Sequence, residues 1–299
     1  MRSTPSTIRR LGAFAAVLLA TAALPAASLL HAGPVPLPRT HAHNDYEHKR
    51  PLLDALDQGF CSVEADVYLV NGELLVAHNR SDVKPERTLQ ALYLDPLRER
   101  FKANGGHIYS ELGTRPALGQ PLSSVAPRVE FTLLIDIKTD GAAVYAKLQS
   151  LLPQYREMLT HFTDTTTKPG AITVILSGDR PRAIVAADKD RWCALDGLIT
   201  DLDTNPPVHL VPLISESWRP TFEWFSNGTI SAKDKSKLQE LVKRTHAQGR
   251  RLRFWGIQDQ PYVWKEFRAA GVDLINTDKL ADLATLLRTP EGSAAPTHP

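Results

Sequence analysis

The sequence contains few cysteines, and this scarcity excludes several kinds of protein. Only Cys61 and Cys193 are present. Two cysteines cannot build a disulfide scaffold, and their positions do not suggest a zinc site. The two thiols either pair in an oxidising compartment or remain buried and free. We favour the free thiols.

The chain also lacks an excess of either charge. It has 35 Lys and Arg against 33 Asp and Glu, a net charge of +2 at pH 7. Three of the arginines, Arg2, Arg9 and Arg10, lie in the first 33 residues, which contain no acidic residue. Without that segment the net charge falls by three, to −1. The remaining chain therefore has no global field suited to nucleic acid.

Long apolar runs are missing except at the start of the chain. The apolar stretch 11–30 follows a basic beginning, and small residues near Ala27 and Gly33 offer cleavage sites. This pattern predicts a signal peptide over residues 1–33 and a secreted or periplasmic protein. An uncleaved membrane anchor is the alternative, since the run is long enough to span a bilayer.

After this segment, short apolar strands alternate with helical patterns, which predicts a parallel sheet. Eight repeats indicate a single-domain, irregular (β/α)8 TIM barrel over residues 34–288, with weak helices after the fourth and fifth strands. An open doubly wound sheet is disfavoured because no Gly-rich phosphate loop follows the first strand. Residues 289–299 are predicted to be a disordered tail. The predicted strands lie near residues 38–43, 60–68, 130–137, 172–177, 195–200, 210–215, 251–255 and 272–276, and the clearest helices over 87–102, 142–152, 233–248, 262–270 and 280–287.

The second predicted strand carries two acidic residues on one face. Alternation along an extended chain puts Glu64 and Asp66 on the same side, about 7 Å apart. Two carboxylates at that spacing repel each other unless a cation lies between them. This geometry predicts a site with oxygen ligands for Mg²⁺ or Ca²⁺.

Two histidines are expected at the same end of this strand. The Asn71-Gly72 turn predicts a tight hairpin that folds His78 back towards the strand end. His43 leaves the preceding strand at that end. In a parallel barrel the active site lies at the C-terminal ends of the strands. The candidates by position are His43, Glu64, Asp66, His78, Asp136, Lys138, Ser177, Asp201, Glu216, Trp255 and Asn276.

This stretch resembles the PLC-like phosphodiesterase superfamily of phosphatidylinositol phospholipases C, glycerophosphodiester phosphodiesterases and sphingomyelinases D. The shared pattern is a histidine after the first strand, Glu-x-Asp on the second, and another histidine after a short hairpin. His43, Glu64, Asp66 and His78 fill these places in order. The run from HNDY to RTLQALYLDPL is most similar to the branch named after altered inheritance of mitochondria protein 6, and the resemblance covers residues 38–290.

The resemblance implies a metal-dependent phosphoric diester hydrolase that acts on a glycerophosphodiester or a phospholipid headgroup. Glu64, Asp66 and Asp136 are expected to hold one divalent cation, Mg²⁺ or Ca²⁺. His43 and His78 are expected to act as general base and general acid, because the pKa of histidine lies near neutrality. The superfamily often attacks with a hydroxyl of the substrate, which would give a cyclic phosphate.

Several site residues keep two interpretations. Lys138 is expected to bind substrate and stabilise the transition state, although Asp136 and Lys138 could instead form a simple salt bridge. Trp255 either shapes the substrate pocket or packs in the core. His41 is a spare site residue or, more often, a polar strand-end group. Segment 217–225 is aromatic and either contacts lipid or a headgroup or, as we favour, packs over the barrel mouth. Asn79 either orients His78 or serves its turn.

The substrate stays open because the sequence departs from its relatives. Asn44-Asp45 replaces the glycine of glycerophosphodiesterases, and no cysteine-rich loop follows His78. The alternatives are a sphingomyelinase D-like phospholipase and a non-catalytic metal- or ligand-binding barrel. A glycoside hydrolase is disfavoured, since its paired carboxylates need no histidines. The expected partners are a small phosphodiester or lipid headgroup and a peripheral membrane surface, with no nucleic acid and no obligate protein partner.

Overall fold

A computed structural model of the chain describes residue 1 and residues 33–110, 129–224 and 229–289. The chain divides into two units, Met1–His31 and Ala32–Pro299, and the second unit carries the fold. The predicted signal peptide and the predicted tail fall almost wholly outside the described residues. No described helix is long and apolar enough to cross a membrane.

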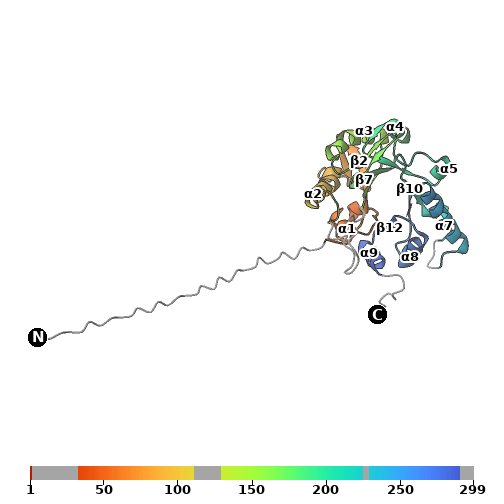
Figure 1. Ribbon diagram of the computed structural model, residues 1–299. Coiled ribbons are helices and arrows are strands. Elements are labelled where there is room, and N and C mark those ends of the chain that lie inside the picture. Colours follow the sequence, from red (N-terminus) through yellow and green to blue (C-terminus); the bar gives the residue numbers. More distant parts are fainter. Residues whose placement is uncertain (2–32, 111–128, 225–228, 290–299) are drawn as a thin grey trace. The chain divides into compact units, whose positions relative to one another are not determined.

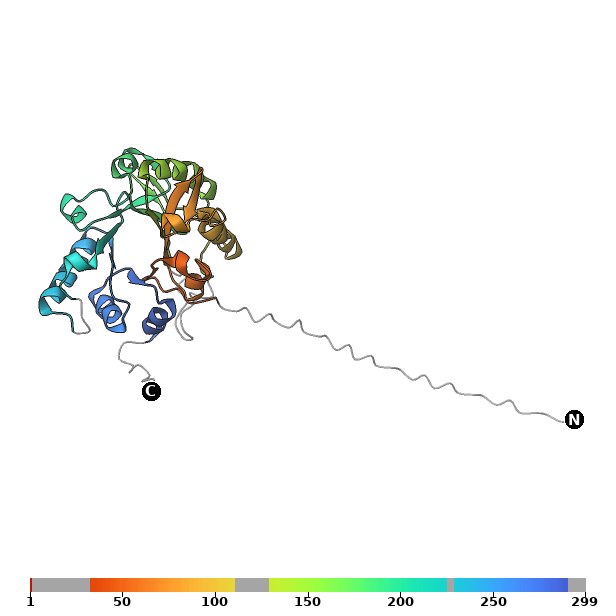
Figure 2. The same cartoon turned by 180° about the vertical axis from the view of Figure 1, so that it is seen from behind.

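Eight parallel strands form the barrel, in the order β11-β10-β9-β7-β4-β2-β1-β12. A bridge between Arg253 and Leu274 joins the two ends of this row and nearly closes the ring. Figures 1 and 2 show the strands as a ring with the helices outside. The predicted barrel is confirmed, and the open sheet is wrong. The strands are β1 (Thr40–Ala42), β2 (Ser62–Val70), β4 (Phe131–Ile137), β7 (Ile172–Gly178), β9 (Ala194–Gly197), β10 (Leu213–Ser217), β11 (Arg251–Trp255) and β12 (Ile275–Thr277).

The helices follow the predicted rhythm with one local difference. The weak helices after the fourth and fifth strands are present as α4 and α5, of 6 and 4 residues. The helix predicted over 87–102 is instead a π turn, η3 (Gln90–Leu94), followed by α2, because Pro96 has no N–H for the α-helical ladder. The helices are α1 (Leu53–Asp57), α2 (Asp95–Ala103), α3 (Gly141–Leu151), α4 (Arg182–Ala187), α5 (Asp201–Thr204), α6 (Trp218–Thr221), α7 (Ala232–Ala247), α8 (Pro261–Ala270) and α9 (Leu280–Arg288).

Smaller elements decorate the barrel. They are the antiparallel strand β3 (Glu73–Val76), a small sheet of β5 (His161–Thr163), β6 (Thr167–Lys168) and β8 (Asp190–Arg191), and the 3₁₀ turns η1 (Asp45–Glu47), η2 (Arg80–Asp82) and η5 (Leu152–Tyr155). The predicted hairpin joins β2 to β3. Asn71 and Gly72 both have positive φ, 50° and 83°, as a tight hairpin turn of the mirror-image type requires.

The barrel interior is built from layers of inward side chains. Four inward side chains, Leu134, Ile175, Leu213 and Leu274, form a buried apolar cluster separate from the main core. Towards the C-terminal ends of the strands, the inward positions are polar instead. Buried polar groups cost free energy unless they are paired. The interactions of this polar layer therefore show which groups serve the fold and which are left for chemistry.

Both cysteines are buried and free. Burial raises the pKa of Cys61 and of Cys193 to about 12. Neither thiol is therefore reactive at neutral pH. The interpretation of two buried free thiols is confirmed.

Candidate active site

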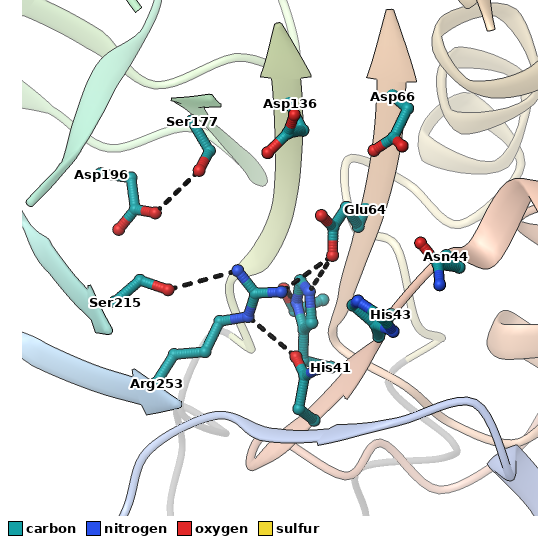
Figure 3. Close-up of polar contacts among 12 residues, drawn as sticks. His41, His43, Asn44, Glu64, Asp66, Asp136, Ser177, Asp196, Ser215 and Arg253 are labelled. Carbon is teal, nitrogen blue, oxygen red and sulfur yellow. Dashed lines mark hydrogen bonds and ion pairs between the residues drawn. The ribbon is translucent and has the colours of Figure 1, made fainter. Parts of the chain in front are cut away.

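Three carboxylates meet at the C-terminal end of β2 and β4. Glu64 and Asp66 lie on β2 and Asp136 on β4, and the strand register places Asp66 beside Asp136. One oxygen from each carboxylate lies within 4.8 Å of the others. Figure 3 shows the three side chains on the two neighbouring strands. The structure thus brings together the three acidic residues that the sequence predicted as a cation site.

Glu64 is held by buried donors through only one of its oxygens. Arg253 on β11 donates to Glu64 Oε2 across the barrel at 2.8 Å, and His41 Nε2 lies 3.3 Å from the same atom (Figure 3). Arg253 also donates to the side chains of Asn276 and Ser215. Burial would raise the pKa of Glu64, but the Arg253 charge and the hydrogen bond from His41 outweigh it and hold the pKa below its ordinary value.

His41 is a structural residue in this network. Its side chain is fully buried, and the Ser62 hydroxyl lies 2.7 Å from Nδ1. Burial, together with the Arg253 charge, lowers the pKa of His41 to about 3, so the imidazole is neutral. The contact with Glu64 is therefore a hydrogen bond rather than an ion pair. Both ring nitrogens are occupied, which favours the strand-end interpretation over a catalytic role.

Lys138 lies between the other two carboxylates. Its Nζ is 2.7 Å from Asp66 Oδ2 and 3.1 Å from Asp136 Oδ1. Burial alone would lower the pKa of Lys138, but these two contacts outweigh it and raise the pKa. Burial and the charge of Glu64 raise the pKa of Asp66 to about 6, and burial also raises that of Asp136. The predicted salt bridge of Asp136 with Lys138 is thus present alongside the acidic cluster.

The residues fit a divalent cation. Asp66 Oδ1 is buried and has no hydrogen-bond partner among the residues that the structure describes. A buried oxygen without a partner is costly, and a cation would satisfy it. The three carboxylates of the cluster are paired with two cationic side chains, Arg253 and Lys138, so one negative charge remains while the histidines are neutral. A donor set made only of carboxylate oxygens suits Mg²⁺ or Ca²⁺.

His43 lies beside this cluster and is oriented by Asp278. The Asp278 carboxylate accepts a hydrogen bond from His43 Nδ1 at 2.8 Å. Burial would lower the pKa of His43, but the hydrogen bond to Asp278 and the charge of Glu64 outweigh it and raise the pKa. Its side chain is 28% exposed. Since Nδ1 is occupied, Nε2 is the nitrogen left for a substrate.

His78 is anchored in a similar way from the other side. Its Nδ1 lies 3.2 Å from Asp66 Oδ2 and 3.0 Å from the Tyr46 hydroxyl. The hydroxyl of Tyr68 donates to the backbone carbonyl of His78 at 3.1 Å. The imidazole is 53% exposed. Two histidines with anchored Nδ1 atoms therefore flank the carboxylates, as the strand and hairpin patterns predicted.

The other strand-end candidates are occupied by the fold. Asp201 accepts hydrogen bonds from Arg182 and from the backbone of Leu198, which also explains why β9 stops before the predicted end. Glu216 accepts from two backbone N–H groups. Ser177 donates to Asp196, and Asn276 accepts from Arg253. These four groups complete hydrogen bonds of the barrel rather than facing a reaction.

The structure also locates Asn79, the aromatic segment 217–225 and Trp255. Asn79 donates to Asp82, as its turn interpretation predicts. Trp218, Phe222 and Trp224 are buried, and Trp218 packs on Phe254 of β11 and Phe267 of α8, so the described part of segment 217–225 packs into the core between strand and helix rather than over the barrel mouth. Trp255 ends β11 with its side chain exposed, and its role in substrate binding stays a prediction.

Sequence reasoning assigned no role to three residues that organise the site: Tyr46, Arg253 and Asp278. A charged residue between the apolar Leu252 and Phe254 was the available signal for Arg253. Asp278 directly follows a strand end, a signal that we did not use. Nothing in the sequence pattern indicates the contacts of Tyr46.

Comparison with known proteins places the chain in a family. The AIM6-like phosphodiesterase domain model matches residues 31–196. The chain belongs to this family. A second model, the glycerophosphoryl diester phosphodiesterase family, matches residues 251–281. The superfamily predicted from the motifs is thus confirmed, and with it a relationship to phosphodiester hydrolases.

Curated relatives support the same placement. The altered inheritance of mitochondria protein 6 homolog of Arthroderma benhamiae is 30% identical, over 82% of this chain and 82% of that protein. Altered inheritance of mitochondria protein 6 of Eremothecium gossypii is 29% identical, over 82% of this chain and 68% of that protein. A glycerophosphodiester phosphodiesterase structure from Agrobacterium tumefaciens is 15% identical, with a TM-score of 0.48 over 83% of this chain and 100% of that chain; this likeness is too distant to carry an argument.

Proposed function

We propose that this protein is a divalent-cation-dependent phosphoric diester hydrolase that acts on a glycerophosphodiester or a phospholipid headgroup. The observation that supports it is one group of side chains at the C-terminal end of the barrel: three carboxylates, two anchored histidines and one lysine. Membership of a phosphodiesterase-type family supports the reaction class. The predicted signal peptide supports action outside the cytoplasm, on a small or membrane-bound phosphodiester.

In this proposal Glu64, Asp66 and Asp136 hold the cation. When bound, the cation neutralises charge on the phosphate oxygens and lowers the pKa of the attacking oxygen. The unpartnered Asp66 Oδ1 supports its role as a ligand. Arg253 fixes the carboxylate of Glu64 and leaves its second oxygen for the cation.

His43 and His78 act as the acid–base pair. Each imidazole is anchored through Nδ1, so each presents Nε2 to the substrate. One removes a proton from the attacking hydroxyl, and the other protonates the leaving oxygen. The raised pKa of His43 favours it as the residue that carries a proton before the reaction and acts as the acid. His78 is then the base.

Lys138 supplies positive charge to the same place. Its ammonium already lies within hydrogen-bonding distance of two of the carboxylates. A phosphodiester that approaches the cluster brings negative charge that increases as the reaction proceeds, and a fixed cation stabilises it. Trp255 is exposed at the end of β11, which supports its proposed contact with the alcohol portion of the substrate.

The test is hydrolysis of bis(p-nitrophenyl) phosphate by the chain without residues 1–33. We expect EDTA to abolish turnover, and Mg²⁺ or Ca²⁺ to restore it. Asp136→Asn should reduce turnover by about 10²-fold or more even at saturating cation, since it removes a ligand charge. Glu73→Gln is the matched control, because Glu73 lies in the adjoining β3 and is exposed.

Calorimetric titration with Mg²⁺ and Ca²⁺ separates the alternatives. Turnover by the wild type, together with weaker cation binding by Asp136→Asn, supports the hydrolase. Cation binding without turnover of any phosphodiester supports a non-catalytic binding barrel. Turnover that EDTA does not affect would contradict the metal-dependent proposal.

A further inference from the structure

The HNDY motif ends in a tyrosine, Tyr46, that the proposed mechanism does not use. Tyr46 is buried, and its hydroxyl lies against three polar groups. The Tyr46 Oη is 2.5 Å from Asp66 Oδ2, 2.7 Å from Asn44 Oδ1 and 3.0 Å from His78 Nδ1. The rings of Tyr46 and His78 are nearly parallel, with an interplanar angle of 17° and centroids 6.5 Å apart.

The hydrogen count at this hydroxyl determines which neighbours donate. A tyrosine hydroxyl has one proton to give and can accept from other donors. The shortest contact runs to Asp66, whose ionised carboxylate can only accept, so the proton of Tyr46 points there. The other two neighbours must then donate to Tyr46. For Asn44 this requires the amide to be turned so that its N–H₂, in place of Oδ1, faces the hydroxyl, an exchange that is allowed because amide oxygen and nitrogen are assigned from the network.

The same count requires a proton on His78 Nδ1. A neutral imidazole carries its proton on one nitrogen only, so Nε2 is left with its lone pair towards solvent. We propose that Tyr46 is a positioning residue: its hydroxyl accepts from His78 Nδ1–H at 3.0 Å, in addition to the longer 3.2 Å contact of Nδ1 with Asp66 Oδ2, and so keeps His78 in the tautomer that can accept a proton at Nε2. This inference rests on the proposed function for its catalytic meaning, but the tautomer itself is a property of the resting chain.

The surrounding loop holds Tyr46 in place. The backbone carbonyl of Tyr46 accepts from Arg87 at 2.6 Å. The neighbouring Asp45 is fully buried and accepts from the Leu52 backbone and the Tyr93 hydroxyl. Leu52 has a positive φ of 63°, unusual for a leucine, which this contact helps to hold. The loop is therefore fixed at both sides of Tyr46.

The Tyr46 hydroxyl lies within hydrogen-bonding distance of both Asp66 and His78. Its contacts suit a fixed link between a histidine and a carboxylate, the arrangement by which a carboxylate orients the general base in hydrolases.

The experiment reads the tautomer directly from nitrogen chemical shifts. Two-bond ¹H–¹⁵N spectra of the chain in EDTA, at about pH 8.5, where histidines are neutral, distinguish Nδ1–H from Nε2–H. The chain has ten histidines, so the signals of His78 are identified by their absence in His78→Gln. We expect Nδ1–H in the wild type and a mixture of tautomers in Tyr46→Phe.

Tyr68→Phe is the matched control. Tyr68 is also buried and its hydroxyl also reaches His78, but it bonds to the backbone carbonyl rather than the imidazole. This variant should keep the wild-type tautomer. The inference is overturned if His78 carries its proton on Nε2 in the wild type. It is also overturned if Tyr46→Phe leaves the tautomer unchanged, or if Tyr68→Phe changes it equally.

Kinetics then connect the tautomer to turnover. Tyr46→Phe should lower kcat by roughly tenfold, part of the 10²–10⁴-fold contribution of a general base, with KM within about twofold. If Tyr46→Phe shows the mixed tautomer but the wild type hydrolyses no phosphodiester, the positioning role stands and the proposed function fails. A kcat as high as that of Tyr68→Phe, despite a mixed tautomer, would overturn the catalytic meaning of the link.

Discussion

The two sides of the barrel use the same type of side chain in different ways. On β2 and β4, three carboxylates crowd within 4.8 Å of one another. On β9 and β10 and the turn after β9, Asp196, Asp201 and Glu216 also occupy inward or strand-end positions. There, Asp201 and Glu216 accept hydrogen bonds from arginine or backbone donors.

The difference shows that position alone does not define a site in this fold. Acidic residues at strand ends satisfy turns and hold connecting loops as readily as they bind a cation. The distinguishing feature is mutual crowding of carboxylates, since a buried oxygen without a partner among the described residues occurs on both sides, at Asp66 and at Asp196. The proposed reaction should therefore depend on the β2–β4 side, whereas the β9–β10 side should affect stability.

The largest expected effect concerns the two histidines beside the β2–β4 carboxylates. His43→Gln and His78→Gln should each lower kcat by about 10²–10⁴-fold, since each removes an acid–base group. His161→Gln is the control, because His161 lies in β5 and pairs with Asp190. Steady-state hydrolysis of bis(p-nitrophenyl) phosphate measures all three. Near-normal turnover in either of the first two variants would remove that histidine from the mechanism.

Replacing one carboxylate on each side by an amide tests whether the two sides differ in role. Asp201→Asn should leave kcat within about twofold of the wild type and reduce the free energy of unfolding by about 1 kcal/mol, since it weakens the bonds to Arg182 and the Leu198 N–H. Asp136→Asn should lower kcat and leave the free energy of unfolding in EDTA unchanged. Urea unfolding and hydrolysis rates, measured on the same samples, give both quantities. Equal losses of turnover in the two variants would erase the distinction between the two sides.

A smaller effect is expected from Asp278, through the pKa of His43. Asp278→Asn removes a charge and weakens a hydrogen bond that raise this pKa, so the pKa should fall. If His43 acts as the acid, its protonated form is lost at lower pH in the variant, and the alkaline limb of the kcat profile moves to lower pH. If His43 is the base, the acidic limb moves instead. A profile that keeps both limbs in place would mean that Asp278 does not tune His43.

The smallest effect concerns Asp196 and the pH dependence of stability. Burial raises the pKa of Asp196 to about 7, while the unfolded chain should show about 3.9. Between these values the folded state holds a proton that the unfolded state has lost, so stability falls as pH rises. Asp196→Asn should reduce the fall in melting temperature between about pH 5 and about pH 8 by a few degrees. The exposed carboxylate of Asp203 offers a control, since Asp203→Asn should keep the wild-type slope.

Much of the fold follows from local patterns in the sequence. Strands buried on both faces appear as continuous apolar runs, so β4 and β7 are visible directly. The Asn71-Gly72 turn fixes the hairpin that returns His78 to Asp66. Alternation on β2 and the end of β4 give the three carboxylates. These features depend on neighbouring residues along the chain, which is why they could be predicted.

The rest depends on contacts between distant segments. Arg253 reaches Glu64 across the barrel, 189 positions away in the chain. Asp278 and His43 are separated by 235 positions. No local pattern specifies such pairs, and only the closure of the barrel brings β11 and β12 to the first strands. The π turn before α2 was missed because the apolar stripe continues through it unchanged.

The small apolar cluster inside the barrel has a consequence for how ligands enter and leave the proposed site. Leu134, Ile175, Leu213 and Leu274 lie across the barrel axis and are almost completely buried. Exposure of the side chains falls from 53% at His78 through 18% at Asp136 to 8% at Glu64. Ion, substrate and products would all arrive and depart from the same side, and an occupant near the histidines would slow the exit of anything bound deeper. Exchange of a bound ion should therefore be slowest while a phosphodiester or its product is in place.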